Sequence, residues 1–181
     1  MNTRPSRKRT RRAGFSLVEV MIGFCVLSIA VGAVASTLVA TTSLNVANEE
    51  LSRALDGQIS QLEELRSVDF EEVFASYNGI EADDPQGAGS APGSDFDVPG
   101  MDAWAGAAAV GSIEFPGDGT ELREDFVDRD LGMPRDLNGD GIIDGLDHSG
   151  DYIILPLRVT VRWSGRSGEV ERSVVHALAN H

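Results

Sequence analysis

The sequence contains one cysteine, Cys25, and three histidines among 181 residues. A lone cysteine excludes an intrachain disulfide framework and any metal site built from a cluster of cysteines. The histidines are widely spaced or terminal, so their spacing does not predict a zinc site. They are His148, His176 and His181. The chain is long enough for one domain with a modest core, which must form without these crosslinks.

Basic residues are scarce beyond the first 14 positions. Six of the 15 lysines and arginines lie in residues 1–14, which hold no acidic residue, and the other nine are set against 29 acidic residues in the rest of the chain. A strongly acidic body repels the phosphates of nucleic acids, so we expect no nucleic-acid partner for it. The short basic segment precedes an apolar run, which is typical of a targeting segment.

The apolar run covers residues 15–44 and carries a single charge, at Glu19. A helix rises about 1.5 Å per residue, so about 20 residues cross the hydrocarbon core of a bilayer. The run is therefore long enough to span a membrane. Because the basic residues precede it, the positive-inside rule predicts that residues 1–14 are cytoplasmic and that the remainder lies across the membrane.

Two interpretations of this N-terminus leave the glutamate unexplained. Ala33-Val34-Ala35 resembles the cleavage site of a Sec signal peptide, although the apolar run continues beyond it. A plain membrane anchor accounts for the basic and apolar segments, but a carboxylate in hydrocarbon costs about 2.5–3.5 kcal/mol. The paired Arg11 and Arg12 also suggest a Tat signal, but Phe15 stands one position too late and the run is too hydrophobic.

A third interpretation accounts for Glu19. Gly14 and Phe15 follow the basic leader, Glu19 follows them, and a long apolar helix lies behind. The segment resembles the class III leader of type IV prepilins and type II secretion pseudopilins. The resemblance implies cleavage between Gly14 and Phe15 by a prepilin peptidase and methylation of the new amino terminus. It also implies a pilin-like subunit, either a minor type IV pilin or a type II secretion pseudopilin.

The resemblance further implies a place in the cell and a set of partners. The chain would cross the inner membrane once, with its C-terminal domain periplasmic or extracellular, and would enter a filament on assembly. The implied partners are the prepilin peptidase, the inner-membrane assembly platform and other pilins or pseudopilins. Glu19 of one subunit would pair with the Phe15 amine of a neighbour, which relieves the desolvation cost of both charges only on assembly.

The sequence predicts an α+β fold, with a long N-terminal helix packed on a small antiparallel sheet. Apolar residues recur at spacings of three and four between residues 48 and 74, so we expect an amphipathic continuation of the helix over residues 45–77. Residues 78–181 form the loop-rich and β part, with a short strand over 110–115. An apolar island at 96–98, together with Trp104, is expected to dock on the helix. Alternation from Tyr152 to Trp163, a turn and a return over 169–178 predict the main hairpin.

Residues 136–147 match the calcium-loop pattern D-x-[DN]-x-[DN]-G-x₅-E, with Asp147 in place of the terminal glutamate. Alternate oxygen-bearing residues on a curled loop supply the six to eight oxygens that calcium requires. The loop resembles EF-hand loops, and more closely their dockerin variant, although a strand rather than a second helix is expected after it. We expect a structural calcium ion with these ligands: Asp136, Asn138, Asp140, the carbonyl of Ile142, Asp144 and Asp147.

Nothing else in the sequence predicts chemistry. No Ser/His/Asp or Cys/His arrangement is evident, so we do not expect an enzyme, and we expect Asp125, Asp128 and Asp130 to be simply solvated. The main alternative to a filament subunit is an exported or membrane-anchored calcium-binding module. A membrane-anchored enzyme with a catalytic metal in the acidic loop is a further alternative, although that loop has no expected nucleophile beside it.

Overall fold

The computed structural model describes residues 14, 16–166 and 168–180. The chain divides into two compact units, Met1–Leu44 and Asn45–His181. Helix α1, Leu17–Ser67, begins in the first unit and ends in the second. The basic leader and Phe15 lie outside the described residues.

In the first unit, α1 is apolar all round. Its large side chains are exposed, including Leu17 at 76% and Ile29 at 74%. Among the helices that the structure describes, α1 alone is long enough and apolar enough to cross a membrane, judged by its length and composition. Its hydroxyl side chains donate to carbonyls of the preceding turn, as Ser28 does to Phe24 at 2.8 Å. These polar groups are therefore satisfied within the helix and add little polarity to its surface.

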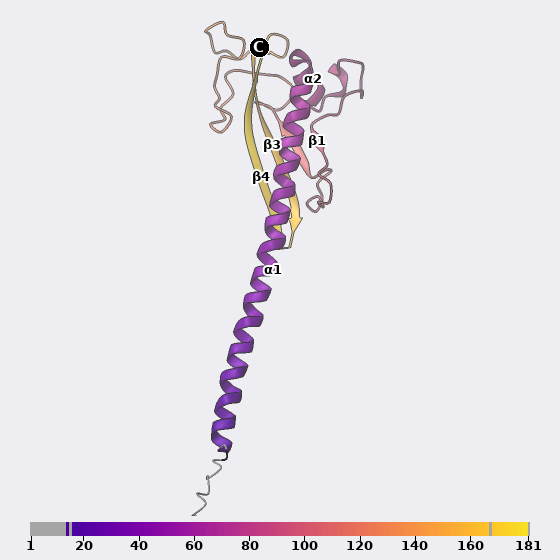
Figure 1. The fold of residues 1–181 in the computed structure, drawn as a ribbon. Coiled ribbons are helices and arrows are strands. Elements are labelled where there is room, and N and C mark those ends of the chain that lie inside the picture. Colours follow the sequence, from indigo (N-terminus) through magenta and orange to yellow (C-terminus); the bar gives the residue numbers. More distant parts are fainter. Residues whose placement is uncertain (1–13, 15, 167, 181) are drawn as a thin grey trace, which may run out of the picture. The chain divides into compact units, whose positions relative to one another are not determined.

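The second unit combines the end of α1 with short helices and a sheet (Figure 1). The short helices are η1 (Phe70–Glu72), α2 (Val73–Tyr77) and η2 (Glu81–Asp83). The strands are β1 (Asp95–Phe96), β2 (Gly111–Glu114), β3 (Ile154–Gly165) and β4 (Gly168–Ala179). They pair antiparallel in the order β1-β2-β3-β4. This confirms the predicted α+β, pilin-like fold class.

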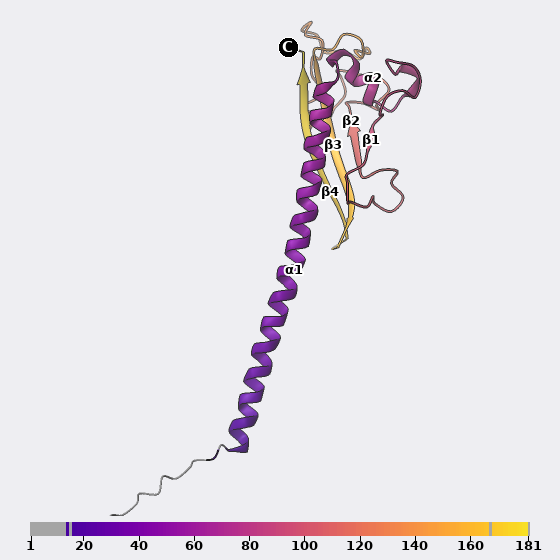
Figure 2. The same cartoon turned by 45° about the vertical axis from the view of Figure 1, so that its right-hand side comes forward.

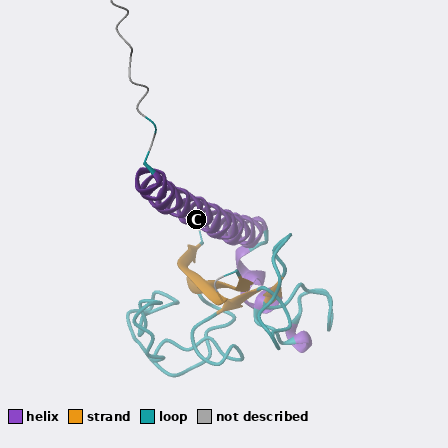
Figure 3. Cartoon of the chain, turned by 90° about the horizontal axis from the view of Figure 1, so that it is seen from below, coloured by secondary structure: helices purple, strands orange, loops and turns teal. Residues whose placement is uncertain are grey.

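The end of α1 lies along β3 and β4 in both side views (Figures 1 and 2). The alternating face of β3 is buried as predicted, with Leu155, Leu157, Val159 and Val161 at 0% exposure. Gln58 also joins the helix to the sheet, because its amide nitrogen donates to the carbonyls of Val159 and Arg172, at 3.0 Å each. Seen from below, the sheet lies between α1 and most loops of this unit (Figure 3).

The helical segment expected to run to residue 77 is interrupted after Ser67. Helices η1 and α2 follow, and they bury Val73, Phe74 and Tyr77 to 1% exposure each. The ring of Phe74 packs edge-on against Phe115, with centroids 5.2 Å apart. Tertiary burial of these side chains therefore determines where the helix ends, and a periodic apolar stripe does not contain that information.

Gly57 allows a close approach between α1 and the loop that follows β1. A Cβ atom on Gly57 would lie 2.6 Å from Cγ2 of Val98, closer than real side chains pack. Val98 is 4% exposed and joins Ala54, Val161 and Trp163 in an apolar cluster, so the island at 96–98 docks on the helix as predicted. Trp104, which was expected to join it, is not part of this cluster. The glycine that costs an isolated helix about 1 kcal/mol is therefore needed for this contact.

Candidate functional site

The processing and assembly residues lie at the start of α1. Gly14 is exposed, and the backbone amides of Glu19 and Val20 donate to the carbonyl of Ser16 at 3.0 and 3.2 Å, which closes the first helical turn. A carboxylate in a first turn is stabilised by the helix dipole by about 0.3–1 kcal/mol. Glu19 is exposed there. Its predicted partner, the Phe15 amine, lies outside the described residues.

The acidic loop curls around its own backbone amides. Oδ1 of Asp136 accepts a hydrogen bond from the amide of Gly139 at 2.6 Å, and Oδ2 accepts one from Gly141 at 2.8 Å. Gly139 and Gly141 have φ of +81° and +85°, which is the left-handed region that glycine adopts without strain. Asn138 and Asp140 each accept from the amide two residues ahead, at 3.0 and 2.7 Å. The curl that the calcium-loop pattern predicts is therefore present.

Glu124 lies inside this loop, although it precedes the pattern in the sequence. Its side chain is fully buried, and Oε1 accepts from the amide of Leu137 at 2.6 Å and from that of Asn138 at 3.3 Å. Oε2 faces the amide of Asp144 at 3.4 Å. Backbone bonds hold the two segments together, among them one from Asp125 N to the carbonyl of Asp144 at 3.1 Å. Glu124 therefore organises both ends of the loop.

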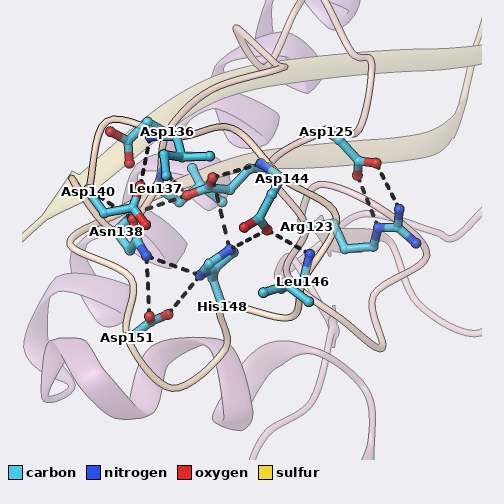
Figure 4. Close-up of polar contacts among 12 residues, drawn as sticks. Arg123, Asp125, Asp136, Leu137, Asn138, Asp140, Asp144, Leu146, His148 and Asp151 are labelled. Carbon is cyan, nitrogen blue, oxygen red and sulfur yellow. Dashed lines mark hydrogen bonds and ion pairs between the residues drawn. The ribbon is translucent and has the colours of Figure 1, made fainter.

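His148 lies between Asp144 and Asp151 (Figure 4). It also connects Glu124 to these loop carboxylates. It is 5% exposed, and its Nε2 lies 3.2 Å from Oδ1 of Asp144 and 3.9 Å from Oε2 of Glu124. Its Nδ1 lies 3.0 Å from Oδ1 of Asp151. Burial alone lowers the pKa of His148, but the hydrogen bonds to Asp144 and Asp151 and the charge of Glu124 outweigh it, so the pKa is raised.

The structure defines a group that could hold a metal ion. Glu124, Asp144 and His148 place one ligand atom each within 4.8 Å of one another. Among the residues that the structure describes, this is the one group of potential metal ligands with such spacing. The cluster includes one of the six predicted calcium ligands, Asp144. Sequence reasoning missed Glu124 and His148, although His148 directly follows the pattern.

The other predicted ligands lie outside this group, and each has backbone contacts of its own. Asp136, Asn138 and Asp140 accept from amides of the loop itself, as described above. Oδ1 of Asp147 accepts from the amides of Leu122 and Ser149, at 3.0 and 3.1 Å. Asp147 therefore joins the end of the loop to the segment that carries Glu124, and Ile142 exposes its side chain.

The expectation that the aspartates of the preceding loop are simply solvated is wrong for Asp128, which is half-buried. Nη2 of Arg158, on β3, lies 2.8 Å from Oδ2 of Asp128, and its Nη1 lies 3.2 Å from Oε2 of Glu114 on β2. The Arg158 guanidinium lowers the pKa of Asp128. Asp125 pairs with Arg123 at 2.8 Å. The Arg158 pairs connect the loop to the sheet.

One comparison with known proteins gives a match. Residues 9–35 match the family described as the prokaryotic N-terminal methylation motif. The motif indicates a precursor of the type IV pilin or pseudopilin kind, which a prepilin peptidase processes and which assembles with other pilins. The apolar helix behind the motif fits membrane anchoring. No curated protein and no solved structure matches the chain.

Proposed function

We propose that this chain is a structural filament subunit, either a minor type IV pilin or a type II secretion pseudopilin. The observation that carries the proposal is that the methylation motif leads directly into α1, Leu17–Ser67, whose end packs on an antiparallel sheet. In this proposal the leader is cytoplasmic, the second unit lies across the inner membrane, and the assembly platform extracts the subunit. The protein acts through its surfaces and is not an enzyme.

The assembly step follows from the chemistry of the first unit. Cleavage at Gly14 leaves an amine on Phe15, and Glu19 supplies a carboxylate to pair with it in a neighbouring subunit. On assembly, the apolar surface of α1 leaves its contacts with lipid and contacts the helices of neighbouring subunits. Gly23 and Gly32 have nothing within 4 Å of a Cβ built on them, so small residues lie open on the helix surface. Such residues allow helices to approach closely.

The first test is the mature N-terminus. We expect intact-mass and N-terminal peptide analysis of the membrane-bound protein to give a chain that begins at Phe15 with a methylated amine. Gly14→Leu should accumulate as the uncleaved precursor, because the peptidase site is blocked. Gly23→Ala, a glycine change inside the apolar helix, should be processed normally. A chain that begins at Ser36 would instead show a Sec signal peptide, and an intact Met1 would show a plain anchor.

We also propose that the loop over residues 136–147 binds a structural calcium ion. The proposed ligands are Asp136, Asn138, Asp140, Asp144, Asp147 and the carbonyl of Ile142. The support is the curled loop, with glycines at the two left-handed positions, together with a chain of formal net charge −14. Calcium would neutralise carboxylates that otherwise repel one another on a tight turn.

Calcium removal is therefore expected to destabilise the second unit. A ligand that binds only the folded state stabilises it by RT ln(1 + [L]/Kd), about 2.7 kcal/mol at a hundredfold excess over Kd. The full chain in detergent should melt several degrees lower in EGTA than in millimolar calcium. Asp136→Asn with Asp140→Asn should abolish the difference, and Asp56→Asn, an exposed change on α1, should retain it. Equal melting temperatures with and without chelator would contradict the proposal.

A further inference from the structure

A neutral His148 with its proton on Nδ1 presents a lone pair to two carboxylates. Its Nδ1 lies 3.0 Å from Oδ1 of Asp151, a contact that requires a proton on Nδ1. The Asn138 amide nitrogen also lies 3.4 Å from Nδ1, but it donates to Oδ2 of Asp151 at 3.3 Å. The opposite nitrogen, Nε2, faces Asp144 (Figure 4). It also faces Glu124, and both carboxylates are acceptors. A lone pair and two anionic acceptors repel one another. A cation has to lie among them, and that cation is either a second proton or a metal ion.

The charge balance favours a divalent ion over a proton. Glu124 is 0% exposed, and in the described residues the ion pairs of Glu124 and Asp144 are made with His148 alone. A single proton would give one imidazolium against three carboxylates, those of Glu124, Asp144 and Asp151. The site would then keep a net negative charge, part of it on a carboxylate without access to water, which is costly. A divalent cation with a neutral imidazole compensates one negative charge more than a proton does, and it lies next to the buried Glu124 carboxylate.

The distances fit one ion bound by nitrogen and oxygen. Ligand atoms bound at about 2.0–2.2 Å in a tetrahedral arrangement lie about 3.3–3.6 Å apart. The separation from His148 Nε2 to Asp144 Oδ1 is 3.2 Å, close to this range, and that to Glu124 Oε2 is 3.9 Å, so the Glu124 oxygen would move about 0.3 Å closer on binding. The Asp151 carboxylate on Nδ1 matches the usual partner of a metal-bound histidine, which fixes its tautomer and ring orientation.

We propose that Glu124, Asp144 and His148 bind a divalent ion of the zinc class, with Asp151 as the residue that orients His148. Calcium prefers oxygen ligands, whereas imidazole with carboxylates suits zinc and neighbouring transition metals. This site shares Asp144 with the proposed calcium loop and differs from it in Glu124 and His148. It does not depend on the filament role. The ion joins the segment around Glu124 to the end of the acidic loop, so its role is structural.

The test measures zinc and calcium separately on the full chain in detergent, after removal of metals with a chelator. We expect about one equivalent of Zn²⁺ by calorimetry and elemental analysis. His148→Gln should weaken Zn²⁺ binding by more than about tenfold, because changing even an outer-shell partner of a ligand costs about 10–100-fold in affinity and His148 is itself a ligand. It should leave the calcium-dependent melting shift unchanged. Asp136→Asn should show the reverse pattern, and His176→Gln, a histidine on β4 outside the site, should bind Zn²⁺ normally.

A spectroscopic measurement on the unchanged protein keeps the test independent of how the variants fold. Co²⁺ bound at a four-coordinate nitrogen and oxygen site should give visible absorption bands that Zn²⁺ removes and millimolar Ca²⁺ does not. Absence of Zn²⁺ binding, equal Zn²⁺ affinity in the His148 and His176 variants, or displacement of Co²⁺ by Ca²⁺ would overturn the proposal. The group would then be a proton-bridged hydrogen-bond cluster or part of the calcium site. None of these outcomes bears on processing at Gly14.

Discussion

Glu19→Gln should leave the chain in the membrane but lower its incorporation into filaments by about a hundredfold or more. Glutamine keeps the size of the side chain and removes its charge, so the Phe15 amine of the neighbouring subunit loses its partner. Removing one member of a buried ion pair costs about 3–5 kcal/mol, and each 1.4 kcal/mol corresponds to about a factor of ten. Membrane insertion should be equal or better, because a carboxylate in hydrocarbon carries a cost.

The measurement is co-purification of the variant with other filament subunits, scaled to its amount in the membrane fraction. Glu63→Gln is the matched control, because it removes the same charge from an exposed position on the same helix. Processing at Gly14 is measured in parallel, so that a failure of cleavage is not mistaken for a failure of assembly. Normal incorporation of the Glu19 variant would contradict the pairing role and leave the helix dipole as the reason for the carboxylate.

The parts of the fold that could be predicted are those determined by local periodicity. The alternation of β3 predicted its buried face because side chains on a strand point to opposite sides, and residues 155–163 follow this rule at every odd position. The hairpin was predicted because two such runs are separated by a glycine-containing turn. The end of α1 was not predicted, because the aromatic residues after Ser67 pack on residues far along the chain, Phe74 on Phe115 and Phe70 on Tyr152.

The candidate site also contains one part that local sequence predicts and another that depends on distant contacts. Asp136, Asn138 and Asp140 have a fixed spacing, and the curl of their loop follows from asparagine, aspartate and glycine chemistry that acts within a few residues. Glu124 has no fixed spacing to the loop, and an isolated glutamate in a polar segment is ordinarily exposed. Its burial depends on the backbone bonds between its segment and residues 135–148. The spacing of the histidines does not predict His148, because its place in the site depends on the carboxylates around it.

The contacts of Glu124 lead to the second large effect. Glu124→Ala should lower the free energy of unfolding by about 2–5 kcal/mol, even without any metal ion. The substitution removes the acceptor for the amides of Leu137 and Asn138, and Leu137 is itself fully buried. Each buried donor left without a partner costs about 1–3 kcal/mol. Glu124→Gln keeps one acceptor oxygen and should cost less, whereas Glu121→Ala, three residues earlier and exposed, should change stability by at most about 0.5 kcal/mol.

Denaturant unfolding in EGTA, followed by tryptophan fluorescence, measures these differences, because Trp163 is buried in the second unit at 3% exposure. Hydrogen exchange locates the effect, since the amide of Leu137 should lose protection in Glu124→Ala and keep it in Glu121→Ala. A loss of stability without faster exchange at Leu137 would mean that Glu124 acts elsewhere in the fold. Equal stability of all three variants would mean that the loop closes without this carboxylate. The expected result, in which alanine is worse than glutamine and exchange rises at Leu137, shows that a residue outside the calcium-loop pattern holds the loop in its curled form.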